Sequence, residues 1–264
     1  WIPRLADVTV LLHAAASVQF EESVEAALRQ NSLGSVAVLS AAAGVLPSLR
    51  AAIHVSTAYV MCDRLGRPSE ELPSLSHLRP EERTHGGLVA LVNRVLAGSL
   101  ESSGNGEAAR LLGDFPNTYC FSKAVSERLL AYRADSFRCP LAIVRPTIVG
   151  AAYAEPAPGW IDSVNAMAGA ILFTSLRIQR EISGIPVVRP DAVPVDRCVN
   201  VCLLVIEHLL ASPTPPTLPS VTVYHASFFS EAFTWQHVAD FCVDYSDRYP
   251  PARALNAASG EFHY

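Results

Sequence analysis

The sequence lacks the features that mark nucleic-acid-binding and membrane-spanning proteins. Its 264 residues contain 20 Lys and Arg against 25 Asp and Glu, a net charge of −5, and no basic run. Nucleic acid partners are therefore not expected, because phosphate binding needs clustered positive charge. Polar or charged side chains interrupt the most apolar segments, 161–176 and 199–211, so neither supplies the roughly 20 apolar residues that cross a bilayer. We expect an intracellular protein that is soluble or at most peripheral to a membrane.

Closely spaced cysteine pairs of the Cys-x-x-Cys type are also missing. The six cysteines show no metal-binding spacing with histidine. They stand at positions 62, 120, 139, 198, 202 and 242. The pattern predicts buried, reduced thiols in a reducing compartment, and no metal site.

Apolar residues, in contrast, make up half of the chain, and only 17% of it is charged. That composition supports a large buried core. Short apolar runs predict buried strands at 8–13, 52–56, 141–145 and 221–225. Helices are expected at 21–30, 35–49, 87–100, 117–133 and 196–211. This alternation predicts an α/β fold with a partial Rossmann-like, doubly wound parallel sheet at 1–150 and a C-terminal substrate lobe at 151–264 packed on it.

Tyr119 and Lys123 stand four residues apart in an expected helix, which places a phenol and an ammonium on one face. A phenol titrates near pH ~10. An ammonium about 4 Å away contributes roughly 4 kcal/mol at an effective dielectric of about 20, which would lower the phenol pKa by about three units before desolvation is counted. The pair is a candidate general acid for a carbonyl oxygen. The same spacing also occurs in exposed helix pairs.

Hydroxyl groups follow the second expected strand. Ser56 and Thr57 stand at its carboxyl end, the edge at which parallel sheets bind ligands. The Thr57 hydroxyl, supported by Ser56, would hold a carbonyl group beside Tyr119. A plain turn or cap is the alternative.

Small residues follow the first expected strand at the same edge. His13, Ala14 and Ala15 would let a flat cofactor ring approach the backbone, or would serve close strand-to-helix packing. Asn31, with Gly34, lies between two expected helices, where its amide would bridge backbone groups in a mainly structural role.

Six segments occur in the following order: His13-Ala14-Ala15 with Val18-x-Phe20, His54-Val55-Ser56-Thr57-Ala58-Tyr59, Asn117-Thr118-Tyr119-x-Phe121-x-Lys123-Ala124, Val144-Arg145-Pro146-Thr147-Ile148-Val149, Glu155-Pro156-x-Pro158-Gly159-Trp160-Ile161-Asp162 and Val193-Pro194-Val195-Asp196. Together they resemble the fatty acyl-CoA reductases, the male-sterility type of thioester reductase among the extended short-chain dehydrogenase/reductases. The resemblance runs from about residue 6 to about residue 250.

This resemblance implies NADPH-dependent reduction of a long-chain fatty acyl-CoA to a fatty alcohol, through a hemithioacetal and an aldehyde, with release of coenzyme A. Tyr119 would protonate the carbonyl oxygen. Lys123 would lower the Tyr119 pKa and hold the nicotinamide ribose hydroxyls. Thr57 or Ser56 would orient the thioester carbonyl.

The resemblance also implies which residues contact the cofactor and the acyl chain. Residues 1–150 would be the C-terminal half of an NAD(P)-binding domain, and 151–264 the substrate-binding lobe. The cofactor would meet His13, Ala14, Ala15, Lys123, Pro146 and Thr147. The substrate would meet Gly159, Trp160 and Ile161. The apolar stretch 164–176 would continue the acyl-chain wall, or would be an ordinary core helix.

Two departures from the family pattern set further expectations. The Gly-rich pyrophosphate loop, Thr-Gly-x-x-Gly-x-x-Gly, does not occur, and the pairs Gly86-Gly87 and Gly104-x-Gly106 follow no expected strand. With Trp1 as its first residue, the chain is expected to be an N-terminally truncated piece that is inactive alone, and the choice of NADPH over NADH rests on resemblance. A hydrophobic anchor is also missing, so a peroxisomal or endoplasmic reticulum membrane location rests on resemblance, and membrane association would need segments outside this chain.

Two other functions remain open from the residues. Another extended short-chain reductase or epimerase, acting on a nucleotide sugar or a sterol, would share Tyr119 and Lys123 without a thioester, but the stretch 158–162 argues against it. A non-catalytic relative is the third interpretation. Tyr119, Lys123 and Thr57 are all present, which argues against the interpretation that the catalytic site has been lost.

Overall fold

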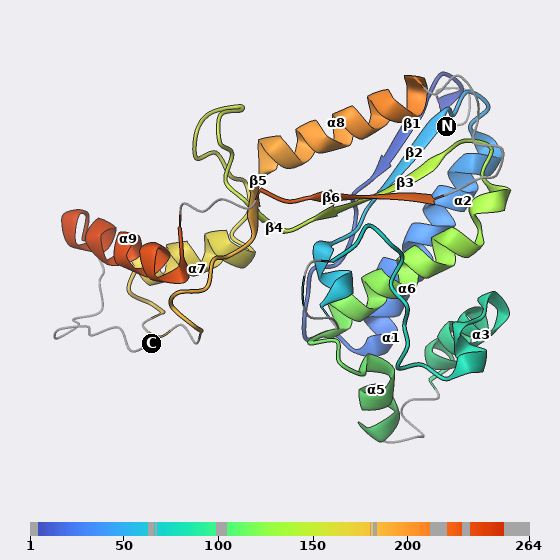
Figure 1. Cartoon of the computed structure of the whole chain (residues 1–264), viewed down its shortest axis with the longest axis horizontal. Helices are drawn as coiled ribbons and strands as arrows, with labels where there is room; N and C mark the ends of the chain where they lie inside the picture. Colours follow the sequence, from blue (N-terminus) through green and yellow to red (C-terminus); the bar gives the residue numbers. More distant parts are fainter. Residues whose placement is uncertain are drawn as a thin grey trace. The chain divides into compact units, whose positions relative to one another are not determined.

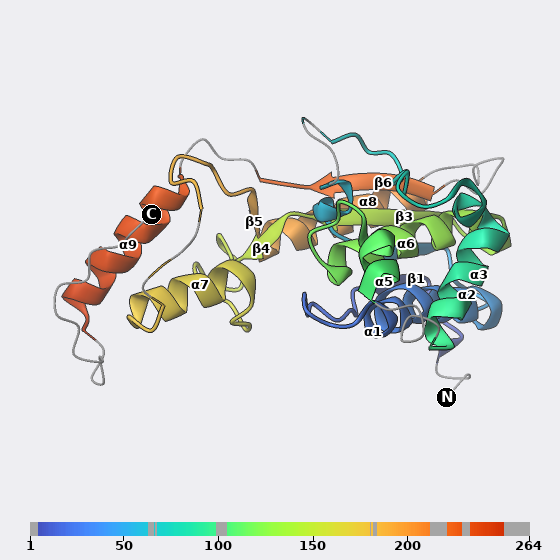
Figure 2. The ribbon, with the colours of Figure 1, turned by 90° about the horizontal axis from the view of Figure 1, so that it is seen from below.

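The computed structural model describes residues 5–62, 66, 68–98, 105–179, 181, 184–211, 221–228 and 233–250. The chain forms two compact units, which Figures 1 and 2 show and which we describe separately. The first contains residues 1–145 and 202–225, and the second contains 146–201 and 226–264. The predicted division put residues 202–225 in the C-terminal lobe, whereas here they join the first unit because they bring a further strand to its sheet.

A four-stranded sheet organises the first unit. Its order is β1 (Val10–His13), β2 (Ala51–Val55), β3 (Leu141–Pro146) and β6 (Val221–Ala226). The pairs β1–β2 and β2–β3 are parallel. Almost every residue of β2 and β3 is buried, as expected for parallel strands covered on both faces. The predicted α/β fold and its four strands are confirmed, with ends shifted by one or two residues.

Helices cover both faces of this sheet. Figure 1 shows α2 (Ser35–Val45) and α6 (Thr118–Tyr132) along one face, and residues 202–211 of α8 (Val195–Ala211) on the other. The residues before α2 are helical too. Helix α1 (Val24–Ala27) continues through a π-helical segment, η2 (Leu28–Gly34), into α2 without a break. The prediction of two separate helices in this stretch was therefore wrong.

Shorter elements complete the first unit. They are η3 (Ala58–Met61), η4 (Pro80–Arg83), α3 (His85–Leu96), α5 (Asn105–Leu112) and η5 (Ala134–Ser136). The core joins leucine and valine side chains of α2, α3 and α6 to β2, β3 and η3. Helix α6 contributes eleven buried residues, which makes it the central helix of the unit.

The second unit is built on a two-stranded parallel sheet, β4 (Ile148–Gly150) with β5 (Ala192–Pro194). Its helices α7 (Ala166–Ser175) and α9 (Trp235–Arg248) pack against each other. The sequence predicted an apolar helix at 164–176, which α7 confirms. Throughout the described ranges of both units, every helix falls short of the length and apolar character needed to span a bilayer.

Candidate functional site

The candidate acid lies in the first turn of α6. Asn117 caps this helix, and its Oδ1 accepts a hydrogen bond of 2.9 Å from the Cys120 backbone N–H. Tyr119 follows the cap, half-buried, with its ring 5.7 Å from the ring of Phe20 in the loop after β1. The N-terminal cap thus fixes where the phenol enters the site, and the predicted helical placement of Tyr119 and Lys123 is confirmed.

The phenol of Tyr119 meets the hydroxyl of Thr57. Thr57 caps η3 at the carboxyl end of β2 and is buried. Desolvation raises the pKa of Tyr119 to about 12, the neighbouring Cys120 adds to the rise, and the hydrogen bond to Thr57 opposes it. The contact expected between Thr57 and Tyr119 is present, but the direction of the pKa shift is opposite to the one the sequence suggested.

The reason lies in where the Lys123 ammonium points. Its Nζ donates a hydrogen bond of 2.8 Å to the backbone carbonyl of Val55, the last residue of β2. Only 2% of Lys123 is exposed, and desolvation lowers its pKa to about 8, opposed by the charge of Glu127. A buried ammonium needs a hydrogen-bond acceptor, and the strand end supplies one. Lys123 is thus held at the sheet edge rather than against the phenol.

Burial of Lys123 makes stability depend on pH in a defined way. Its pKa of about 8 lies below the ordinary 10.5, so the unfolded chain binds more protons between these two values. The contribution of Lys123 to the free energy of unfolding should therefore rise with pH over this window and stay flat below it. Urea unfolding of wild type and Lys123→Met at several pH values tests this. We expect the free energy of unfolding of wild type minus that of Lys123→Met to rise from about pH 8 to 10.5. If this difference falls or stays constant, the burial of the ammonium is contradicted.

Two histidines near Lys123 form a buried pair. The Nδ1 atoms of His13, at the end of β1, and His54, in β2, are 3.3 Å apart, and the His54 Nε2 lies 3.3 Å from the Ser126 hydroxyl. Desolvation, followed by the positive charge of Lys123, lowers the pKa of both imidazoles. The pair is therefore neutral near pH 7, with one Nδ1 as donor and the other as acceptor.

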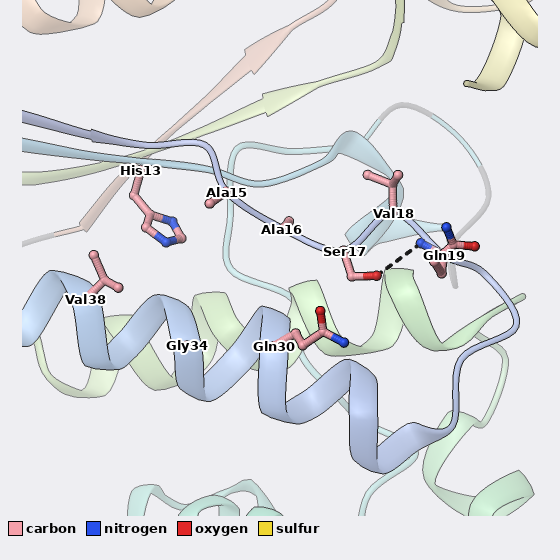
Figure 3. Close-up of a pocket in the computed structure, with 9 residues that line it drawn as sticks. All are labelled: His13, Ala15, Ala16, Ser17, Val18, Gln19, Gln30, Gly34 and Val38. Atoms are coloured by element: carbon pink, nitrogen blue, oxygen red, sulfur yellow. Dashed lines mark hydrogen bonds between the residues drawn. The ribbon is translucent and has the colours of Figure 1, made fainter. Parts of the chain in front are cut away.

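A cavity of about 570 Å³ opens beside His13 at the carboxyl end of β1 (Figure 3). One wall is the loop after β1, and the other is a face of the helical stretch that η2 and α2 form. The lining residues are His13, Ala15, Ala16, Ser17, Val18, Gln19, Gln30, Gly34 and Val38. The carboxyl edge of a parallel sheet is the usual ligand position in this class of fold.

Sequence reasoning found part of this lining. It singled out His13 and Ala15, which line the cavity, and Ala14, which is exposed and does not. It missed the helical wall, although Gln30, Gly34 and Val38 recur every four residues, a spacing that places them on one helix face. The wall was missed because the stretch around Gly34 was interpreted as a break between helices.

The loop between β1 and α1 is fixed by the amide of Asn31. Its Oδ1 accepts from the Ser17 backbone N–H at 2.9 Å, and its Nδ2 donates to the Ser17 carbonyl at 3.0 Å and to the Ser122 hydroxyl at 3.1 Å. Only 1% of Asn31 is exposed. The predicted bridging, structural role of Asn31 is present, and it ties the cavity loop to α6.

A dinucleotide fits several observations at this edge. The Ser56 hydroxyl is buried and, within the described part of the chain, has no hydrogen-bond partner. The buried cation of Lys123 sits at the same strand end, and the loop of alanines beside the cavity presents accessible backbone. An unpartnered buried hydroxyl is uncommon and suits a site completed by a ligand.

The remaining predicted site residues belong to the second unit. Pro146 ends β3, and Thr147 follows it, buried, with its backbone N–H donating to the Ala226 carbonyl at 3.1 Å. Gly159 has φ near +80°, which makes the tight turn before Trp160 possible. Side chains of Trp160 and Ile161 are 42% and 39% exposed. The structure thus gathers Tyr119, Lys123, Ser56, Thr57 and His13 in the first unit, and the residues that the sequence predicted to meet the substrate, Gly159, Trp160 and Ile161, in the second.

Asp196 organises the loop that precedes Gly159, Trp160 and Ile161. Its carboxylate accepts hydrogen bonds from the backbone N–H groups of Tyr153 and Ala154, both at 2.9 Å, and of Glu155 at 3.2 Å. These bonds, that from Tyr153 foremost, lower the pKa of Asp196 to about 2. The Arg197 guanidinium lies 5.0 Å from the centre of the Tyr153 ring. The segment 193–196 was part of the family resemblance, but the sequence assigned no role to it. In the structure its Asp196 supports the loop before Trp160.

Comparisons with known proteins add a family relationship to this geometry. A family profile described as "Male sterility protein" matches residues 2–202. The chain is 32% identical over 227 residues to Fatty acyl-CoA reductase 2 of Mus musculus, and 34% identical over 200 residues to Fatty acyl-CoA reductase 1 of Gallus gallus. These matches cover 84% and 74% of this chain, but only 40% and 35% of the two relatives. The chain thus spans about two fifths of the length of the curated relatives it matches.

Solved structures confirm the fold independently. UDP-glucuronic acid 4-epimerase from Bacillus cereus, in complex with NAD, superposes with a TM-score of 0.60 at 15% identity. The superposition covers 99% of this chain and 64% of the epimerase. At this identity the likeness concerns the Rossmann-type architecture alone.

Proposed function

Because this chain belongs to the male sterility family and resembles fatty acyl-CoA reductases over most of its length, we propose that the protein carrying it reduces long-chain fatty acyl-CoA to fatty alcohol with NADPH. Tyr119, Lys123, Thr57 and Ser56 form the catalytic group. Coenzyme A leaves when the hemithioacetal formed from the thioester collapses to an aldehyde, and a second reduction gives the alcohol.

One observation carries the proposal: the Thr57 hydroxyl, buried at the carboxyl end of β2, lies close enough to the Tyr119 phenol to oppose the rise of its pKa. It combines a proton donor with a second hydroxyl, the arrangement that can hold and protonate one carbonyl oxygen. A phenol with a pKa of about 12 stays protonated at neutral pH. It remains a competent acid, since the alkoxide formed by reduction of a carbonyl is a stronger base than the phenolate.

NADPH would supply the hydride when bound. Lys123, close to the strand end, would hold the nicotinamide ribose hydroxyls with its buried ammonium. Ser56 offers a hydroxyl that has no hydrogen-bond partner among the described residues, for the substrate carbonyl or the cofactor amide. His13 and Ala15 would border the cofactor from the cavity side, while Ala14 faces solvent. By family resemblance, Pro146 and Thr147 would line the nicotinamide side.

An apolar surface for the acyl chain is available in the second unit. Besides Trp160 and Ile161, helix α7 and its flanks leave several large apolar side chains exposed. These are Val164, Leu172, Phe173 and Leu176. Exposed apolar side chains in one segment suit a long hydrocarbon substrate.

The test is to incubate the full-length protein with palmitoyl-CoA and NADPH while following free thiol and NADPH absorbance. We expect thiol release that depends on NADPH, with two NADPH consumed for each thiol because the aldehyde is reduced again. NADH in place of NADPH is expected to support slower turnover. Conversion of a nucleotide sugar without thiol release would show an epimerase instead and would overturn the proposal.

A further inference from the structure

Three polar side chains form a stripe along one face of α6. Tyr119, Lys123 and Glu127 follow one another at intervals of four residues, a spacing that places them on the same side of a helix. Lys123 and Glu127 are 2% and 0% exposed. The first two residues belong to the candidate site, whereas the Glu127 carboxylate binds Arg145 of β3.

Arg145 holds the Glu127 carboxylate in one position. The guanidinium Nε donates to one carboxylate oxygen at 2.9 Å, and Nη2 donates to the other at 2.6 Å. Nη2 also donates to the Glu71 carbonyl at 2.7 Å. Two parallel hydrogen bonds between fully buried side chains fix both the distance and the orientation of the pair. The Glu127 carboxylate therefore stays one helical turn from Lys123.

Lys123 needs a nearby negative charge, because its burial removes the water that stabilises an ammonium. The Val55 carbonyl accepts a hydrogen bond at 2.8 Å but carries no net charge. The imidazoles that face Lys123, His13 on β1 and His54 on β2, have lowered pKa values and are neutral near pH 7. Residues four apart on a helix have Cβ atoms about 5–6 Å apart, so the Glu127 charge acts on Lys123 through a buried, low-dielectric interior.

We propose that Glu127, held by Arg145, is a positioning residue that keeps Lys123 as an ammonium at the end of β2. This inference rests on the proposed function, in which Lys123 holds the nicotinamide ribose hydroxyls. An ammonium has three donors, and the Val55 carbonyl takes one, so two remain for the ribose. The Tyr119 phenol is protonated at neutral pH and supplies no negative charge. In agreement, the charge of Glu127 opposes the fall in the Lys123 pKa that burial causes.

The experiment measures the ionisation of Lys123, which is the single lysine of the sequence. Full-length protein is treated briefly with acetic anhydride, which reacts with neutral amines, over a series of pH values and beside a reference amine. Trypsin does not cleave after acetylated lysine, so the peptide 111–123 is replaced by an acetylated peptide 111–128. The pH of half-maximal labelling reports the pKa of Lys123, which we expect at about 8 in wild type.

Glu127→Gln should lower this labelling midpoint by about one pH unit or more, the range for loss of a neighbouring opposite charge. A role in packing alone would leave the midpoint unchanged. Glu82→Gln is the matched control, since Glu82 is 5% exposed and is bound by Arg94 and Arg110, outside α6. The control should lose stability and keep the wild-type midpoint.

A second variant keeps the test decisive if Glu127→Gln does not fold. Glu127→Leu combined with Arg145→Met removes the same carboxylate together with its partner, and its midpoint should fall as well. An identical midpoint in wild type and in the folded variants, or an equal fall in Glu82→Gln, overturns the proposal.

The same variants connect the charge to the reaction. The alkaline limb of kcat/KM for palmitoyl-CoA should move to lower pH together with the labelling midpoint, and a limb that stays in place overturns the positioning role. Labelling needs neither NADPH nor palmitoyl-CoA. A lowered midpoint in a protein that releases no thiol would therefore contradict the proposed function while the effect of Glu127 on Lys123 stands.

Discussion

Replacement of Tyr119 by Phe is expected to lower kcat for palmitoyl-CoA reduction by about 10²-fold or more, the range for loss of a general acid. The phenol is half-buried beside the Thr57 hydroxyl, so water has limited access to take its place. A group that acts only in the transition state lowers kcat and kcat/KM equally. Steady-state kinetics of the full-length variant measures this, and we expect a lower kcat with a KM close to that of wild type.

Tyr132→Phe is the matched control for this variant. Tyr132 lies on the same helix, and its hydroxyl donates to the Arg83 carbonyl, outside the site. Loss of this hydrogen bond should cost about 1 kcal/mol of stability and leave kcat unchanged. If Tyr119→Phe keeps wild-type kcat, or if both variants lose activity alike, Tyr119 is not the acid.

The largest expected effect on stability comes from Arg145→Met. The Arg145 guanidinium binds the Glu127 carboxylate through two hydrogen bonds of 2.9 and 2.6 Å, and both side chains are 0% exposed. It also donates to the Glu71 carbonyl at 2.7 Å. The substitution leaves the Glu127 charge buried without its partner, so we expect a loss of roughly 3–5 kcal/mol in unfolding free energy. Urea unfolding at neutral pH measures it.

Two further proteins make this prediction specific. Arg29→Ala breaks an exposed pair with Glu25, in which the two side chains are 59% and 37% exposed, and should cost about 0.5 kcal/mol or less. The double variant Arg145→Met with Glu127→Leu should be more stable than Arg145→Met alone, because the buried Glu127 carboxylate that lost its partner is removed as well. A cost for Arg145→Met as small as that for Arg29→Ala would mean that the pair does not hold α6 to β3.

The strands and the central helix could be predicted because their determinants are local. Apolar runs bounded by turns placed β1, β2, β3 and β6 within two residues, and Asn117 with the following helix formers placed α6. The continuous helix through residues 24–45 could not be predicted this way. Its π-helical segment contains Asn31, which bonds to Ser17 and Ser122, residues distant in the sequence. Gly34 has ordinary helical backbone angles and therefore does not end the helix.

The contacts and pKa shifts of the site residues were less predictable than which residues form the site. The spacing of Tyr119 and Lys123 placed both on one helix, but the acceptor for the Lys123 ammonium is a backbone carbonyl, which no side-chain pattern reveals. The sign of the Tyr119 pKa shift followed from burial, which a spacing argument does not measure.

The most direct test of the central claim is a single-turnover measurement with full-length protein in excess over palmitoyl-CoA. Stopped-flow absorbance would follow the oxidation of NADPH in wild type and Tyr119→Phe, separating the chemical step from product release. The account predicts that the chemical step itself slows by about 10²-fold or more when the phenol is removed. An unchanged rate of NADPH oxidation in the variant would contradict it.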